Sequence, residues 1–138
     1  MGLKVVDGGA ADAARTVEIE KSAFGPDPMS PALFPGPMPE DSTQRVQSRV
    51  DTINGSPYLR LVKVVDEELE AQGKESTVAF SIWYIWDKDT LSESTWPPKR
   101  GDMGPGVNAE ALGKFMGGMK NKMFESYDGK HVMCRCFL

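Results

Sequence analysis

The stretch TVAFSIWYIWD, residues Thr77–Asp87, is the strongest β-strand signal in the chain, because it is rich in aromatic and β-branched residues. Side chains on a strand alternate between two faces. The two resulting sets are Phe80, Ile82, Tyr84 and Trp86 on one face, and Ser81, Trp83 and Ile85 on the other. Because both sets are largely apolar, we expect helices to cover both faces of the sheet.

A second strand, Tyr58–Asp66 (YLRLVKVVD), comes shortly before the first. The charged segment Glu67–Ser76 between them predicts a turn, and the two strands then form an antiparallel hairpin whose loop is too long for a tight turn. A short apolar strand, Leu3–Val6, opens the chain and is closed by Asp7-Gly8-Gly9.

Two helices are predicted between the first two strands. Ala10–Phe24 has apolar residues at helical spacing, and a second helix begins at a cap, Asp41 or Ser42, and runs to about Ile53. The segment between them, Gly25–Pro39, carries six prolines, which exclude regular helix. It also carries Met29, Leu33, Phe34 and Met38. We interpret it as an ordered apolar loop, either lining a pocket or simply packed on the core.

The C-terminal third predicts one more helix and one more strand. Asn108 caps a helix to about Tyr127, where the pair Gly117-Gly118 suggests close backbone approach. The last strand, 130–138, is apolar, so its edge needs pairing by an earlier strand, another chain or a further segment. We therefore expect one α+β domain over 1–138, of order β-α-α-β-β-α-β with a mainly antiparallel sheet, and a homodimer formed through strand 130–138.

Composition narrows the classes of partner. The chain has 138 residues and a net charge of −4 with no basic block, which argues against a nucleic-acid partner. No apolar run has the length of a membrane helix and no signal peptide is recognisable, so we expect a soluble cytoplasmic protein that does not bind membranes. Cys134 and Cys136 are two residues apart on a strand, too far for easy bridging, and reduced thiols are the simpler interpretation.

Few residues offer chemistry. His131, Cys134 and Cys136 form H-x-x-C-x-C, but His131 and Cys134 face opposite sides of a strand, so we expect no metal site. Cys134, Tyr84 and His131 are the candidates for proton transfer or nucleophilic catalysis, although a strand cysteine is more often a small buried hydrophobe. No Walker loop, G-x-G-x-x-G or G-x-S-x-G motif is present.

The predicted order of helices and strands, with the proline-rich loop between the first two helices, resembles the N-terminal half of a GNAT-superfamily N-acetyltransferase. Ile19–Phe24 followed by Pro28–Pro37 looks like the opening of fungal members, and Leu61–Asp66 and Ala79–Trp83 look like their second and third strands. In the family, the fourth strand runs into a Q/R-x-x-G-x-G/A loop whose backbone N–H groups hold the acetyl-CoA pyrophosphate. Here that strand resembles His131–Leu138, where the chain ends.

The resemblance implies acyl transfer from acetyl-CoA to an amine, driven by proximity and by proton removal from the amine. It implies thioester polarisation by backbone groups near Cys136, Phe137 and Leu138. It also implies an acceptor pocket shaped by the loop between the first two helices, here Phe24 to Met38. The residues that we expect to bind the substrate are Phe24, Met29, Leu33, Phe34 and Trp83. Two alternatives stay open: a shortened relative recruited to another small-molecule reaction, and a non-catalytic remnant that binds a ligand or partner.

Overall fold

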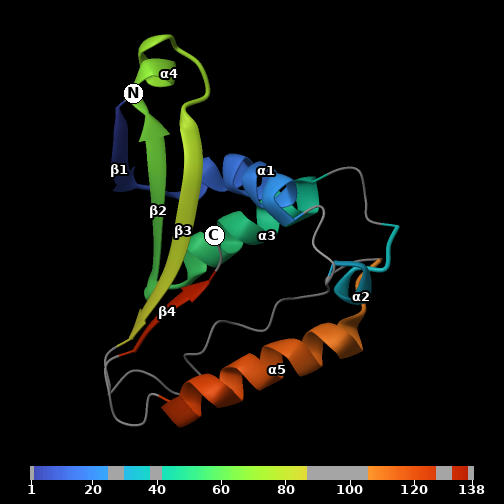
Figure 1. Cartoon of the computed structure of the whole chain (residues 1–138). Coiled ribbons are helices and arrows are strands. Elements are labelled where there is room, and N and C mark those ends of the chain that lie inside the picture. Colours follow the sequence, from blue (N-terminus) through green and yellow to red (C-terminus); the bar gives the residue numbers. More distant parts are fainter. Residues whose placement is uncertain (1, 25–29, 38–41, 87–105, 127–131, 137–138) are drawn as a thin grey trace.

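The computed structural model describes residues 2–24, 30–37, 42–86, 106–126 and 132–136 of the chain (Figure 1). Its centre is a four-stranded sheet of order β1-β2-β3-β4 in which every neighbouring pair is antiparallel. The strands are β1 Leu3–Asp7, β2 Leu59–Asp66, β3 Thr77–Trp86 and β4 Val132–Cys136. The α+β class and the β2–β3 hairpin predicted from the sequence are both confirmed.

The strand register determines which residues are neighbours across the sheet. Leu59 lies opposite Tyr84, and a bulge between Val64 and Val65 adds a residue to β3 near its start. On the other side of β3, Tyr84 pairs with Cys134. Strand 132–136 is thus paired by an earlier strand, which is one of the three pairings that the sequence left open, and it is an outer strand of the sheet.

One face of the sheet is covered by helices. A 3-10 turn, η1 Ala10–Asp12, leads into α1 Ala13–Phe24, and α3 Thr43–Gly55 packs beside α1. The chain enters this layer at Gly8, where a Cβ atom would come within 2.7 Å of Leu61, so only glycine fits. The core beneath the helices consists of Leu59, Leu61, Phe80, Ile82, Tyr84 and Trp86, with Ile19, Ile53 and Tyr58 packed against it.

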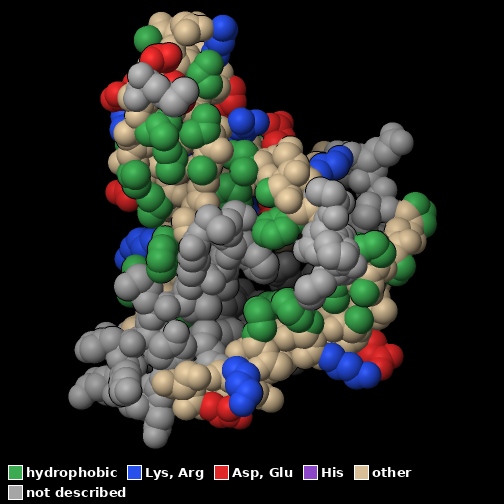
Figure 2. All heavy atoms as spheres, in the orientation of Figure 1, with side chains coloured by type: hydrophobic (Ala, Val, Ile, Leu, Met, Phe, Trp, Pro, Cys, Tyr) green, Lys and Arg blue, Asp and Glu red, His purple; other side chains and the backbone are tan. Residues whose placement is uncertain are grey.

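The opposite face is not covered by the described helices, so the expectation that helices cover both faces is wrong for this part of the chain. We call this surface the open face; by register and exposure its apolar residues are Leu3, Val5, Val62, Val64, Ala79, Trp83 and Ile85, and it also carries Asp7, Arg60 and Ser81. Leu3 is 59% exposed and Val5 is 70% exposed. Figure 1 shows no helix in front of these strands, and Figure 2 shows hydrophobic side chains over them. Alternation identified an apolar face but carried no information about which element would pack on it.

The proline-rich segment contains a short helix, contrary to the expectation that its prolines exclude one. The helix α2 spans Ser30–Leu33 and has Pro31 in its first turn, where the missing N–H costs no intrahelical bond. Gly36 N–H donates to the carbonyl of Gly106 (3.2 Å), and Asn108 N–H donates to the carbonyl of Leu33 (2.9 Å). These bonds join α2 to the start of the long helix α5, Ala109–Ser126.

Two further predictions concern helix ends and glycines. Asn108 caps α5 as expected, because its side-chain oxygen accepts from the N–H of Ala111 at 3.1 Å. The segment Glu67–Ser76 is predicted to be a turn, but it contains the short helix α4, Glu67–Ala71. The Asp66 carboxylate caps this helix by accepting hydrogen bonds from the N–H groups of Glu68 and Leu69. The expected close approach at Gly117-Gly118 is not found among the described residues, where a Cβ atom at either position would meet nothing within 4 Å.

The helices differ in length, and α5 is the longest of those described. Among the described residues, no helix is both long enough and apolar enough to cross a bilayer.

Candidate functional site

The centre of the β3–β4 pair brings two of the predicted catalytic residues together. Tyr84 and Cys134 are register partners on adjacent strands. Tyr84 is only 6% exposed, and its ring stacks on Trp86 with centroids 5.4 Å apart. Tyr58 extends this cluster at 6.2 Å from Trp86. The Tyr84 side chain therefore belongs to a packed aromatic cluster in the core.

The predicted substrate-binding Trp83 lies on the other side of the same strand. It is half-buried on the open face, whereas the adjacent Tyr84 is in the core. Ser81, also on that side, has a buried hydroxyl oxygen without a hydrogen-bond partner in the described chain. One small molecule resting on Trp83 would thus be separated from Tyr84 by the sheet itself.

The predicted acceptor pocket is only partly described. Phe24 ends α1 and is half-buried, and Leu33 and Phe34 are half-buried beside α2. Leu33 is held by the start of α5, so this part of the segment packs with α5. Met29, His131, Phe137 and Leu138 lie outside the described residues, and Cys136 is placed by its backbone as the register partner of Ile82. The roles assigned to these residues stay predictions.

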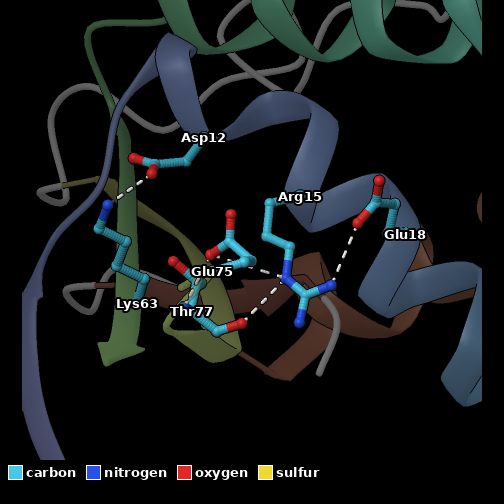
Figure 3. Close-up of polar contacts among 6 residues, drawn as sticks. All are labelled: Asp12, Arg15, Glu18, Lys63, Glu75 and Thr77. Carbon is cyan, nitrogen blue, oxygen red and sulfur yellow. Dashed lines mark hydrogen bonds and ion pairs between the residues drawn. The ribbon is translucent and has the colours of Figure 1, made fainter. Parts of the chain in front are cut away.

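An ion pair that sequence reasoning missed fastens the first turn of helix to the sheet. Lys63 of β2 reaches Asp12 of η1, with Nζ 2.5 Å from Oδ1, and the second carboxylate oxygen accepts the N–H of Gly9 at 2.9 Å (Figure 3). Burial by itself would raise the pKa of Asp12, but the hydrogen bonds from Lys63 and Gly9 outweigh it and lower the pKa below its ordinary value. Asp12 is therefore a carboxylate at neutral pH, engaged on both oxygens.

Arg15 makes the second polar link between α1 and the sheet. Its Nε donates to the carbonyl of Thr77 at 2.9 Å and lies 3.9 Å from Glu75, while Nη1 is 3.1 Å from Glu18 (Figure 3). The backbone N–H of Thr77 donates to Glu75 and, together with Arg15, lowers the pKa of that carboxyl. The cluster ties the start of β3 to α1, and both of its carboxylates are occupied by local partners.

A third cluster lies between α1 and α3. Glu20 accepts from Arg49, and Arg45 lies 3.6 Å from the same carboxylate. The guanidinium carbon of Arg49 is 5.8 Å from the centre of the Phe80 ring, within range of a cation–π contact. Glu20 and Arg49 each retain about one sixth of their side-chain exposure, at 16% and 15%. This arrangement pairs its charges internally and joins both helices to β3.

These three polar clusters link helices to the sheet and offer no evident catalytic group. Among the described residues, no group of three histidine, cysteine or acidic side chains is placed to hold a metal ion. The sequence did contain one signal for the first cluster: Lys63 interrupts the alternation of Leu59, Leu61 and Val65, and a charge at an inward position needs a partner. Nothing in the local pattern of α1 or α3 pointed to the Glu20–Arg49 pair.

Comparison with protein-family models, curated proteins and solved structures found no match for the chain. The acetyltransferase resemblance therefore rests on the motifs of the sequence alone.

Proposed function

We propose that the chain is a GNAT-like small-molecule enzyme that transfers an acyl group from acetyl-CoA to an amine. The observation that carries the proposal is the order of elements: β1, helices α1 and α3 with a proline-rich segment between them, the β2–β3 hairpin, α5 and then β4. It is the order that the resemblance implies, and it joins all four strands in one antiparallel sheet. A recruited enzyme acting on another small molecule is the nearest variant of this proposal.

The backbone of β4 is where the chain would hold the cofactor. Because β4 is an outer strand of the described sheet, its outward N–H and C=O groups face no strand there and suit an extended ligand. By resemblance these groups belong to Cys136, Phe137 and Leu138. Bound acetyl-CoA supplies an acyl thioester, and the backbone donors beside it would hold its carbonyl and favour attack by a neighbouring amine.

Proton removal from the amine falls to Cys134, Tyr84 or His131 in this proposal. Tyr84 and Cys134 are supported by being register partners, with Cys134 on the outer strand β4 and Tyr84 on the neighbouring strand β3. The acceptor amine would bind near Phe24, Met29, Leu33 and Phe34. Trp83 would contact only a ligand that binds on the open face. The large contribution to rate would come from holding amine and thioester together.

The same open edge supports a homodimer in which strand 130–138 pairs with its two-fold copy. Such pairing would cover the edge of β4 and place two sheets side by side. It also competes with the cofactor for the same backbone groups, so acetyl-CoA binding by this edge predicts loss of the pairing between the two β4 strands.

A second candidate function is a non-catalytic protein that binds a ligand or partner. The burial of Tyr84 in a stack with Trp86 favours it, because a packed aromatic cluster leaves the phenol remote from solvent. The two functions differ in whether coenzyme A binds.

Isothermal titration calorimetry with acetyl-CoA and with coenzyme A tests the proposal on the whole chain. We expect micromolar binding, followed by acetylation of at least one member of an amine panel. Substituting Cys134→Ser and Tyr84→Phe should then lower turnover while leaving acetyl-CoA affinity within about twofold. Absence of binding at millimolar ligand would retire the acetyltransferase function and leave the binding function.

A further inference from the structure

The open face is a large apolar surface without a partner in the described chain. Leu3, Val5 and Ile85 are 59%, 70% and 45% exposed, and Val62, Val64 and Trp83 are half-buried among them. Two exposed charged residues share this face, since Arg60 is the register partner of Trp83 and Asp7 that of Val62. Soluble proteins seldom leave a contiguous apolar patch of several strands exposed, so this face indicates an interaction site.

The helix α5 carries the complementary surface. Its apolar stripe consists of Leu112, Phe115, Met116 and Met119, of which Phe115 is 37% exposed and Met119 is 41% exposed. Its principal contact in the described chain is with the short helix α2, and the hydrogen bonds from Gly36 and Asn108 hold its start there. Figure 1 shows α5 standing apart from the strands, and Figure 2 shows hydrophobic side chains along its inner edge.

The two surfaces match in size. With 18 residues, α5 is about 27 Å long and about 10 Å wide, while β3 with ten residues is about 33 Å long. One helix therefore covers about 270 Å² of sheet in projection. Two reciprocal contacts, counted on both partners, bury roughly 1,100 Å², and projection understates accessible area. That value exceeds the area of most crystal contacts and passes the threshold of about 1,000 Å² expected of a biological interface.

We propose that the occupant of the open face is α5 of a second copy of this chain, in a two-fold dimer whose two helix-on-sheet contacts are identical. The helix of one copy stays fastened to its own α2 and lies on β1–β3 of the other. A second copy is the partner of choice because the chain itself supplies both surfaces, and the principal described contact of α5 is with α2 and not with the sheet. This contact is separate from edge pairing of β4, and it leaves that strand available to a ligand.

Sedimentation velocity on the full chain and three variants tests this interface. Val5→Lys places a charge on the open face, Met119→Glu places one on the apolar stripe, and Glu125→Lys changes an exposed residue near the end of α5 as a matched control. We expect a wild-type dimer at tens of micromolar. Each apolar-to-charged variant should weaken dimerisation about a hundredfold, because every dimer carries the change twice, and the control should dimerise normally.

A mixture of Val5→Lys and Met119→Glu gives the decisive result. A heterodimer of these variants has one unaltered contact and one contact in which the introduced lysine would face the introduced glutamate, so we expect mixing to restore most of the dimer. Circular dichroism confirms that each variant is folded. A monomeric wild type, dimers that both variants preserve, or a mixture that stays monomeric would each overturn the proposal; preserved dimers would indicate edge pairing of β4 instead.

Discussion

Ile85 and Trp86 are consecutive residues of β3, yet Ile85 is 45% exposed and Trp86 only 1%. Trp86 belongs to the face covered by α1 and α3, where Tyr58 and Tyr84 pack against it. Ile85 belongs to the open face, which has similar apolar character but receives no described helix. The difference teaches that composition alone does not decide burial: a face is buried when some element of the chain, or of another chain, packs on it.

Truncating the covered face should have the largest effect on stability. Trp86→Ala is expected to lower the free energy of unfolding by about 3–5 kcal/mol, because it opens a cavity within the aromatic cluster. Ile85→Ala, one residue away, should cost less than about 1 kcal/mol at protein concentrations below those that support a dimer. Urea unfolding followed by circular dichroism measures both, and equal losses would mean that the two faces are equally buried.

The packing of α1 and α3 on the sheet should depend on Arg49, whose guanidinium group lies over the Phe80 ring of the core. Arg49→Ala is expected to cost about 1–3 kcal/mol, because it removes the main partner of Glu20 and the contact over Phe80. Arg45→Ala, at the same carboxylate but 45% exposed, should cost less than about 1 kcal/mol. The same unfolding assay compares them, and a larger loss for Arg45 would show that the pair does not anchor α3 to the sheet.

Much of the covered face could be predicted from the sequence, because it depends on local patterns. The alternation from Phe80 to Trp86 identifies the inward set of β3, and Asn108 is identifiable as a helix cap. Local patterns miss the helix α4, because they place Asp66 at the end of a strand, although its carboxylate also caps the turn that follows. One residue can both end a strand and cap the following helix, and the spacing of apolar residues in the sequence does not reveal the second role.

The candidate site was less predictable, because it depends on register and on contacts between elements. Tyr84 and Cys134 are both candidates from the sequence, but their pairing follows from the β3–β4 register, which no local pattern contains. The predicted site contains both Trp83 and Tyr84, although alternation already sends the two side chains to opposite faces of the sheet. The contact between Arg49 and Phe80 arises only when α3 packs on β3, so helical spacing could not reveal it.

The pair of Asp12 and Lys63 predicts a pH dependence of stability on the covered side. The pKa of Asp12 in the fold lies below its ordinary value of 3.8. Its contribution is therefore complete above about pH 4 and is lost as the pH falls through the folded-state pKa. Asp12→Asn should cost about 1 kcal/mol at pH 7, and the difference from wild type should shrink below about pH 4. Unfolding curves from neutral to acidic pH measure this, and a constant difference would exclude the ionised pair as its cause.

The smallest effect is expected at the remote end of the hairpin, away from both faces. Asp66→Ala should cost about 1 kcal/mol or less, because α4 loses the acceptor for two N–H groups. Asp66→Asn keeps a side-chain oxygen and should recover most of the loss. Amide hydrogen exchange of Glu68 and Leu69 reports the cap directly, and unchanged exchange in Asp66→Ala would contradict its role.

Acrylamide quenching of tryptophan fluorescence across protein concentration tests the contrast between the two faces most directly. Two variants each retain one tryptophan of β3 and replace the other, together with Trp96, by phenylalanine. We predict that Trp86 is protected at every concentration, whereas Trp83 is quenched readily at nanomolar protein and becomes protected at tens of micromolar, when α5 of a second copy covers it. Equal protection of both tryptophans at nanomolar protein would contradict an open face, and a Trp83 that stays quenchable at the highest concentration would contradict its covering by a second copy.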